Sequence, residues 1–199
     1  MTLTAGQDRT DVDFPYTGTG SLGDTVWFDI DNSGDATIDT GETGLGGIGI
    51  TVTWHGADGI PGNADDVTFA TVTDTNGAYS VGNLPAGSFT VSVDPTTVPA
   101  GMVPTYDLDG IGSTGTASVA LGIGEDRTDV DFSYTGTSTI TSVVTFDVNG
   151  DGTNDPNDPG ISGVTVVVTW HGPDGIPGNG DAVTFTTVTG TNGVYSVGN

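Results

Sequence analysis

The most constraining feature of this sequence is that it repeats itself. Gly6 to Tyr16 reads GQDRTDVDFPY, and GEDRTDVDFSY follows 118 residues later at Gly124 to Tyr134. Trp54 to Gly62 reads WHGADGIPG, and WHGPDGIPG follows 116 residues later at Trp170 to Gly178. A repeat of about this length is the size of a small domain, so the chain is expected to be part of a tandem array of domains.

The repeat divides the chain into three parts. We expect residues 1–18 to be the C-terminal strand of one repeat, residues 19–136 a complete repeat, and residues 137–199 the N-terminal half of the next. Because half a sandwich leaves an open edge and an unfilled core, we expect the natural protein to be longer. The alternative is that identical chains complete one another, since residues 3–16 match the final strand of the complete repeat.

Apolar and polar side chains alternate within the complete repeat. The alternating positions are Val26, Phe28 and Ile30; Ile48, Ile50, Val52 and Trp54; Phe89, Val91 and Val93; Val119 and Leu121; and Val130, Phe132 and Tyr134. A period of two is typical of strands with one buried face, and turn signals such as Asn76-Gly77 separate the runs. The pattern predicts an all-β fold, an antiparallel β-sandwich of about seven strands per unit.

The charge balance excludes several classes of function. The chain has 26 acidic and 2 basic residues, a formal net charge of −24, and no cysteine. Two arginines cannot form the basic patch that nucleic-acid binding requires, and anionic lipid would repel this surface. No apolar run approaches the roughly 20 residues of a membrane span. We therefore expect neither nucleic-acid binding nor membrane insertion.

Two acidic loops at matching positions carry most of the candidate chemistry. Over residues 147–158, oxygen-bearing side chains stand at positions 1, 3, 5, 9 and 12, with glycine at position 6. This is the spacing of an EF-hand calcium loop without its flanking helices, and Mg²⁺ would need tighter geometry. The candidate Ca²⁺ ligands are Asp147, Asn149, Asp151, Asp155 and Asp158 here, and Asp29, Asp31, Ser33, Asp35, Asp39 and Glu42 in the first loop.

The first loop contains two more residues than the second, inserted after Gly34. Asp39 then aligns with Asp155 and Glu42 with Asp158, which accounts for the change of offset from 118 to 116. Carboxylates about 4 Å apart repel by roughly 4 kcal/mol per pair at an effective dielectric of 20, and a bound divalent cation removes that penalty. The alternative is a solvated turn. We expect the first loop to lie near the junction at residues 17–20.

Weaker candidate ligands follow each WHG motif. They are Asp58, Asn63, Asp65 and Asp66 and, in the next unit, Asp174, Asn179 and Asp181. No spacing rule supports this set, and a long hairpin connection explains it nearly as well. Asp107 and Asp109 are either ligands or turn residues.

The sequence contains no recognisable catalytic arrangement, so we expect no enzymatic activity. His55 and His171 lie beside the Asp loops, but neither a nucleophile motif nor a zinc cluster accompanies them, and we interpret both as strand-end residues. Arg127 stands among three aspartates and is expected to pair locally. Trp54 is in register with a core stripe, whereas Trp27 lies on the opposite face of its strand and has the weaker case for burial.

Several motifs together resemble a known family. Gly23 to Asp29 (GDTVWFD), residues 44–52 (GLGGIGITV) and Thr73 to Val91 (TDTNGAYSVGNLPAGSFTV) are similar to the B-like repeat of serine-aspartate repeat surface proteins, SdrD B-like, within the collagen-adhesin B-type group. The resemblance covers a whole repeat. It implies an Ig-like or transthyretin-like sandwich that acts as a calcium-rigidified spacer on bacterial surfaces.

The resemblance also implies ligands and shows departures. The family's calcium ligands would map onto Asp29, Asp31, Ser33, Asp39 and Glu42, and onto Asp147, Asn149, Asp151, Asp155 and Asp158. The first loop carries an insertion, and Thr145 stands where the first unit has Trp27. Some relatives have a Lys–Asn isopeptide cross-link, which this lysine-free chain cannot form, so calcium would have to supply the stiffening.

These observations predict a structural role. We expect a calcium-stabilised repeat segment of a long extracellular surface stalk, adhesin or filament, whose partners are neighbouring repeats or identical chains arranged head to tail. The alternative is an adhesive module that recognises glycan or a host or matrix protein through exposed loops. Near-identical repetition favours the spacer, because a binding tip usually occurs once.

Overall fold

The computed structural model describes residues 5, 13–113, 115–178 and 180–198, and within them it is all-β, as predicted. The described residues contain no α-helix, only the 3₁₀ turn η1 (Ile111–Ser113). The strands are β1 (Gly20–Phe28), β2 (Thr43–Gly44), β3 (Gly49–Trp54), β4 (Val67–Val72), β5 (Ala78–Leu84), β6 (Gly87–Val93), β7 (Met102–Asp107), β8 (Thr116–Leu121), β9 (Asp126–Arg127), β10 (Phe132–Gly136), β11 (Thr139–Val143), β12 (Thr165–Trp170), β13 (Val183–Val188) and β14 (Val194–Gly198).

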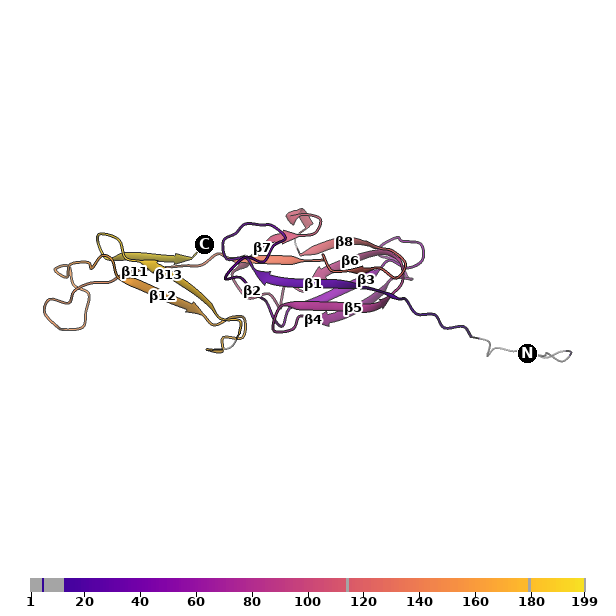
Figure 1. Ribbon diagram of the computed structural model, residues 1–199, viewed down its shortest axis with the longest axis horizontal. Helices are drawn as coiled ribbons and strands as arrows, with labels where there is room; N and C mark the ends of the chain where they lie inside the picture. Colours follow the sequence, from indigo (N-terminus) through magenta and orange to yellow (C-terminus); the bar gives the residue numbers. More distant parts are fainter. Residues whose placement is uncertain (1–4, 6–12, 114, 179, 199) are drawn as a thin grey trace.

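Strands β1 to β10 form a sandwich of two sheets (Figure 1). One sheet has the order β4-β3-β6-β8 and is antiparallel throughout. The other has the order β2-β1-β10-β7, with β5 and β9 also paired to β1. The predicted sandwich was antiparallel, but β1 runs parallel to β10 and to β9. Parallel pairing needs a long crossover, and the whole repeat lies between β1 and β10.

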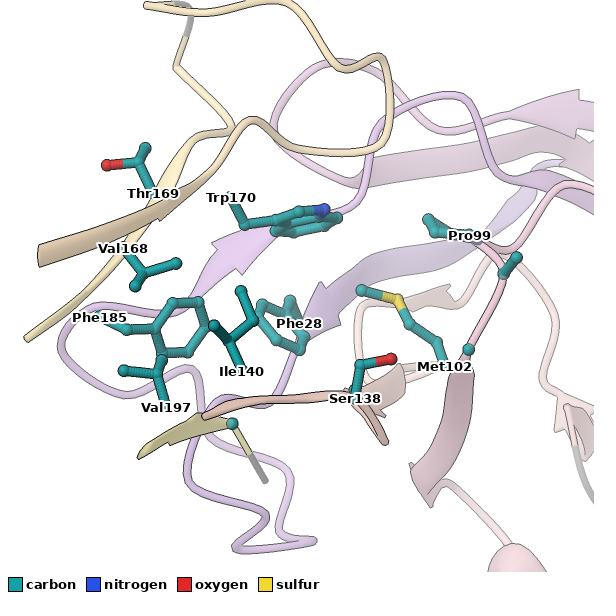
Figure 2. A pocket seen from close by; sticks show the side chains of 14 residues that line it. Phe28, Pro99, Met102, Ser138, Ile140, Val168, Thr169, Trp170, Phe185 and Val197 are labelled. Atoms are coloured by element: carbon teal, nitrogen blue, oxygen red, sulfur yellow. The ribbon is translucent and has the colours of Figure 1, made fainter. Parts of the chain in front are cut away.

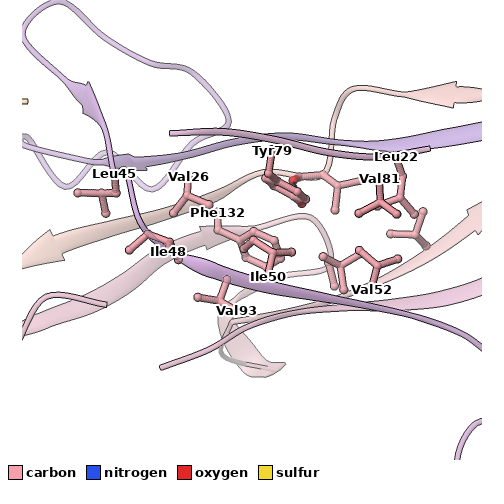
Figure 3. Close-up of a cluster of buried hydrophobic side chains, with 14 of the residues drawn as sticks. Leu22, Val26, Leu45, Ile48, Ile50, Val52, Tyr79, Val81, Val93 and Phe132 are labelled. Atoms are coloured by element: carbon pink, nitrogen blue, oxygen red, sulfur yellow. Dashed lines mark hydrogen bonds between the residues drawn. The ribbon is translucent and has the colours of Figure 1, made fainter. Parts of the chain in front are cut away.

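The core lies between the two sheets and follows the predicted alternation (Figure 3). Of the predicted alternating positions, all are buried except Ile30 and Trp54, which pack against the core from its edge. The final strand contributes Phe132, fully buried, to the same core cluster as Ile50 and Val52 of β3. Each such side chain stabilises the fold by about 1.5–3 kcal/mol through burial of apolar surface.

Two buried polar side chains of the sandwich, Tyr79 and Thr73, make hydrogen bonds to distant parts of the chain. The Tyr79 hydroxyl donates to the Val130 carbonyl oxygen at 2.5 Å, which fastens β5 to the start of the final strand. The Thr73 hydroxyl accepts from the Ile48 amide at 2.9 Å and donates to the Leu45 carbonyl at 2.6 Å. Such bonds are worth about 1 kcal/mol each when made and cost more when one partner is lost.

Residues 137–198 repeat two of the strand pairings found in residues 20–84. β11 pairs with β14 as β1 pairs with β5, and β12 pairs with β13 in the register of β3 with β4. Thr189 repeats the bonds of Thr73, accepting from Val164 at 2.9 Å and donating to Ile161 at 2.7 Å. The internal repeat of the sequence is therefore a repeat of structure.

The structure corrects the expectation for the two tryptophans of the first unit. Trp27 is only 1% exposed, with its ring centroid 6.2 Å from that of Tyr106. Trp54, expected in the core, is only partly buried. Trp27 is buried against Tyr106 and is not part of the core cluster, whereas Trp54 is the last residue of β3, where the strand ends.

The two units meet end to end through aromatic side chains (Figure 2). The Phe28 ring lies edge-on to Trp170 at 5.1 Å between centroids, and 6.4 Å from Phe185. Met102 and Ile140 line the same apolar pocket. Edge-to-face pairs of this kind contribute about 0.5–1.5 kcal/mol beyond their buried area. The joint therefore consists of apolar contacts between the end of β1 and the next unit.

Candidate metal centre

The first acidic loop begins directly after β1. Asp29 is 1% exposed, and its two carboxylate oxygens accept from the backbone amides of Ser33 and Gly34, both at 3.1 Å. The Asp31 carboxylate also accepts from Ser33, at 3.0 Å. Gly34 has φ +65°, in the left-handed region where glycine is favoured, which allows the loop to curl around the carboxylates.

Glu42 closes the loop just before β2. One of its oxygens accepts from the Ile30 amide at 3.0 Å and the other from the Asp39 amide at 2.9 Å. One oxygen each from Asp29, Asp31 and Glu42 lies within 4.8 Å of the others. Two oxygens bound to one Ca²⁺ at about 2.4 Å are at most about 5 Å apart. The spacing of these three carboxylates therefore fits a calcium ion.

The electrostatics of the loop differ between its two ends. Burial opposes ionisation of Asp29, but the Thr105 hydroxyl and the loop amides outweigh it, so the pKa of Asp29 lies below its ordinary value. Burial, and then the charges of Asp29 and Asp31, raise the pKa of Glu42 above its ordinary value, although two backbone amides counteract them. The fold thus gathers negative charge that no basic side chain in the described part of the loop offsets.

The second loop repeats this hydrogen-bond pattern. Asp147 accepts from the amides of Gly150 and Gly152, as Asp29 does from its own loop. Asp158 accepts from Val148 at 3.1 Å and from Asp155 at 2.9 Å, as Glu42 does from Ile30 and Asp39. The matching bonds agree with the predicted alignment of Glu42 with Asp158, across the two-residue insertion.

The remaining predicted ligands of these loops do not belong to the cluster of Asp29, Asp31 and Glu42. Asp35 accepts from the Thr37 amide at 2.8 Å, and Asp39 is exposed. The Asn149 side-chain amide donates to Asp151 and Asp155, at 2.9 and 3.1 Å. Asp29, Asp31 and Glu42 are the three that the structure brings together within the part it describes. The wider ligand set remains a prediction.

The weaker loops after the WHG motifs are held by internal hydrogen bonds. Asp58 accepts from Ile60 and from the Asn63 side chain, both at 2.9 Å, and Asp65 accepts from the Ala57 amide at 3.0 Å. Asp66 accepts from Gly62 at 2.7 Å. In the next unit Asp174 accepts from Ile176 at 2.8 Å and Asp181 lies against Gly172, while Asn179 falls outside the described residues. These bonds match the hairpin-connection interpretation, and metal binding here stays a prediction.

The first loop does not lie near the junction at residues 17–20. The nine residues of β1 separate the two, which at about 3.3 Å per residue is roughly 30 Å. The loop instead lies at the opposite end of the unit, next to the joint with the C-terminal unit, because Asp29 directly follows Phe28. The sequence alone could not show at which end of the strand the loop meets a neighbour.

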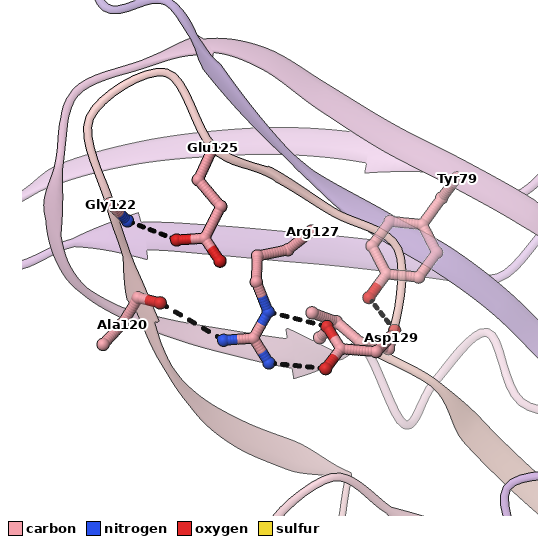
Figure 4. A network of polar contacts seen from close by, with 7 residues as sticks. Tyr79, Ala120, Gly122, Glu125, Arg127 and Asp129 are labelled. Atoms are coloured by element: carbon pink, nitrogen blue, oxygen red, sulfur yellow. Dashed lines mark hydrogen bonds and ion pairs between the residues drawn. The ribbon is translucent and has the colours of Figure 1, made fainter.

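Two of the side chains that could suggest catalysis, Arg127 and His55, have structural partners, whereas Nδ1 of His171 is buried without a hydrogen-bond partner among the described residues. The Arg127 guanidinium makes two bonds to Asp129, each 2.7 Å, and a third to the Ala120 carbonyl at 3.2 Å (Figure 4). The His55 ring nitrogen Nε2 lies 2.9 Å from the Thr90 hydroxyl. The expected local pairing of Arg127 and the strand-end position of His55 are confirmed.

Asp131 gives the complete unit a pH dependence outside the candidate site. Burial, reinforced by the charges of Asp24 and Asp129 and opposed by the Thr25 amide, raises the pKa of Asp131 to about 6. The ordinary value is about 3.9, so the folded state favours the protonated acid. Its contribution to stability is full below about pH 4 and is lost as the pH rises through about 6.

We therefore expect Asp131→Asn to raise the stability of the unit at pH 7. The side chain retains an acceptor for the Thr25 amide, 3.0 Å away, and loses its charge. The expected gain is about 1–2 kcal/mol, below the roughly 3 kcal/mol of the full pKa difference because the group is partly exposed. Melting curves from pH 4 to 8 measure it. The exposed repeat counterpart, Asp13→Asn, is the control, and parallel curves for wild type and Asp131→Asn would contradict the assignment.

Fold and loop geometry together define a class of protein, a tandem β-sandwich repeat with an acidic loop after its first strand. The family model described as SdrD B-like domain matches residues 20–134, more than half of the chain. The chain belongs to the SdrD B-like domain family, as its motifs predicted. Among the described residues, no helix is long and apolar enough to cross a membrane.

Curated relatives match most of the chain. Serine-aspartate repeat-containing protein F from Staphylococcus epidermidis is 32% identical over 192 residues, covering 92% of this chain and 10% of that protein. Serine-aspartate repeat-containing protein D from Staphylococcus aureus (strain Newman) is 30% identical over 200 residues, covering 98% and 13%. The chain thus spans about a tenth of the length of these relatives. They are surface proteins, and the chain is an extracellular or cell-surface segment.

Solved structures show a looser likeness. The shaft pilin SpaA from Lactobacillus rhamnosus GG has a TM-score of 0.41 at 10% identity, covering 91% of this chain and 82% of that one. The Bacillus anthracis TIE protein has a TM-score of 0.39 at 16% identity, covering 91% and 26%.

Proposed function

We propose that this chain is a calcium-stabilised structural segment of a surface stalk or filament, with residues 19–136 as one complete repeat and residues 137–199 as the first half of the next. The observation that carries the proposal is the position of the carboxylate cluster of Asp29, Asp31 and Glu42. It lies one residue beyond Phe28, which contacts the next unit. A cation held there stiffens the end of β1 at the joint.

The loop residues have separable roles in this proposal. Asp29 follows the last residue of β1, and Glu42 precedes the first residue of β2, so the two carboxylates span the base of the loop. Calcium supplies two positive charges to a group of three carboxylates and removes most of their mutual repulsion. With the loop neutralised, the conformational freedom of residues 29–42 falls, and so does that of the neighbouring joint.

A calcium titration of the whole chain tests the proposal. We expect calcium to raise the melting temperature and small-angle X-ray scattering to show a narrower range of inter-unit distances with calcium than with EDTA. The same concentration of Mg²⁺ should have a smaller effect, because Mg²⁺ requires near-ideal octahedral geometry. If calcium changes neither the melting temperature nor the scattering, the acidic loops are solvated turns and the proposal fails.

The joint itself can be tested by Trp170→Ala. The substitution removes the ring that lies edge-on to Phe28, so we expect greater inter-unit flexibility and little change in the melting of the complete unit. Small-angle scattering in calcium gives the first readout and calorimetry the second. Val167→Ala, 58% exposed on the same strand, is the control and should leave both unchanged. Scattering from Trp170→Ala that matches wild type would show that the aromatic contact does not hold the joint.

A second candidate function is adhesion through the loops after the WHG motifs. Ile60 and Ile176 are 58% and 57% exposed near their tips, and both units present them. One relative is named bone sialoprotein-binding protein, from Staphylococcus aureus (strain MRSA252), 32% identical over 74% of this chain and 12% of that protein. A glycan and matrix-protein array with wild type and Ile60→Ser tests it. Binding that the substitution abolishes would favour the adhesive module over the spacer.

A further inference from the structure

The complete unit has an apolar face at the end where the chain enters it. Trp54 and Phe69 line a pocket there, together with Gly18 of the segment that precedes β1. Val67 and Ile123 line the same pocket, and both are exposed. We refer to Trp54, Val67, Phe69 and Ile123 as the Trp54 face. Apolar side chains gathered on the surface of so acidic a chain mark a site of interaction.

The C-terminal unit has the same aromatic pair, and there the pair is occupied. Trp170 and Phe185 stand 116 residues after the two aromatic residues of the Trp54 face, and both lie edge-on to Phe28 (Figure 2). Strands β12 and β13 pair in the register of β3 and β4, so both units hold the pair in the same way. Gly136 lines the joint as its counterpart Gly18 lines the other pocket. The joint therefore indicates which side chain the Trp54 face accepts.

Burial on the receptor side differs between the two units. Val67 is opposite Trp54 in its strand pair and is 42% exposed. Its counterpart Val183, opposite Trp170 at the occupied joint, is 2% exposed. Removing apolar surface from water is favourable, so the exposed Trp54 face favours a partner that covers it.

The chain also presents a second phenylalanine of the kind that fills the joint. Phe146 stands 118 residues after Phe28 and, like Phe28, directly precedes an acidic loop. The Phe146 amide donates to the Pro159 carbonyl oxygen at 2.9 Å, and Phe28 pairs with Thr43 at the corresponding position. Phe28 is 4% exposed, whereas Phe146 is 59% exposed. One chain thus carries both an exposed phenylalanine and an exposed receptor face.

We propose that the Trp54 face receives Phe146 of a second copy of this chain, by the contact that Phe28 makes with Trp170. This inference rests on the end-to-end arrangement in the proposed function, but not on its calcium site. Because the donor and receptor are different surfaces, the contact is heterologous and continues from copy to copy. The net charge of −24 opposes the contact, and dissolved salt screens that repulsion.

Cysteine cross-linking tests the contact, because the chain has no cysteine of its own. One full-length copy carries Ile123→Cys on the Trp54 face, and the other carries Val148→Cys, two residues beyond Phe146; both positions are exposed. The copies are mixed in about 0.5 M NaCl, where the Debye length is about 4 Å, with calcium or with EDTA. A flexible bis-maleimide is added, and the products are separated by denaturing electrophoresis. We expect about tenfold more cross-linked dimer from the mixture than from either variant alone, because head-to-tail docking brings unlike ends together.

Two substitutions on the cysteine variants separate docking from random collision. Phe146→Ser removes the inserted ring, and Val67→Asp places a charge on the receptor face, so we expect each to lower the dimer yield about tenfold. Both side chains are exposed, so both variants should fold. Val167→Ser is the matched control, because Val167 is as exposed as Phe146 but lies within β12, and it should leave the yield unchanged.

The outcomes separate this docking from the proposed calcium site. A mixture that yields no more dimer than the single variants, or a yield that Phe146→Ser does not lower, would overturn the docking. Equally strong cross-linking of Val148→Cys to itself would also overturn it, since the association would then be symmetric. Cross-linking in both calcium and EDTA supports the docking even if the calcium titration fails. Cross-linking in calcium alone supports the docking and shows that it requires the neutralised loops.

Discussion

Phe132→Ala is expected to lower the free energy of unfolding of the complete repeat by about 3–5 kcal/mol, the usual range for deleting a buried aromatic ring. Phe132 is fully buried in β10, and its strand pairs with both β1 and β7. The loss therefore leaves a cavity where the closing strand meets the facing sheet. Because single domains have only about 5–15 kcal/mol of stability, a substantial part of the population should unfold at 37 °C. Urea denaturation followed by circular dichroism measures the change.

The sequence offers an unusually close control for this experiment. Phe14 stands in the same DVDF motif, 118 residues earlier, but is 74% exposed. Phe14→Ala is expected to change stability by less than about 0.5 kcal/mol, as surface substitutions usually do. Equal losses in the two variants would mean that the Phe14 side chain is packed against other residues in solution. A small loss in Phe132→Ala alone would contradict the burial of the closing strand.

Much of this fold could be predicted from period and repetition. The alternating apolar residues between Val26 and Tyr134 predicted the buried face of most strands, because a strand with one buried face alternates apolar and polar side chains. β7 was missed, since Pro104 interrupts its pattern at a shift of register against β10. Proline is tolerated there because β7 is at the edge of its sheet. Edge strands with irregular pairing leave a weak sequence signal.

The candidate site was predicted in composition but not in position. Loop spacing identified Asp29, Asp31 and Glu42 as candidates, because alternate oxygen side chains with a glycine turn match the spacing of a calcium loop. The sequence did not show whether the loop lies at the junction near residues 17–20 or at the joint with the C-terminal unit, because this depends on the direction in which β1 runs through the sandwich. The burial of Asp107 could not be read from the sequence either, since it depends on packing between β7, β10 and the turn that follows. The sequence showed only that Asp107 and Asp109 precede a glycine, a pattern that fits either a ligand loop or a turn.

Asp31→Asn is expected to reveal calcium binding through a stability difference that depends on the metal. Asp31 uses one oxygen to accept from Ser33 at 3.0 Å, and asparagine keeps that bond while removing the charge. In EDTA the variant should be as stable as wild type or slightly more so, because the Asp31 charge is one of those that raise the pKa of Glu42. In saturating calcium the order reverses, since the variant lacks a charged ligand.

The size of the reversal follows from linkage. A ligand that binds only the folded state at 1,000 times its dissociation constant adds about 4 kcal/mol of stability. A 10- to 100-fold loss of affinity in Asp31→Asn then removes about 1.4–2.8 kcal/mol at the same calcium concentration. Calorimetric melting of both proteins, each in calcium and in EDTA, measures the four values, with Asp74→Asn as the charge-matched control. A variant that melts below wild type by the same amount in both media would mean that Asp31 acts through the folded loop alone, and calcium binding at this cluster would have to be abandoned.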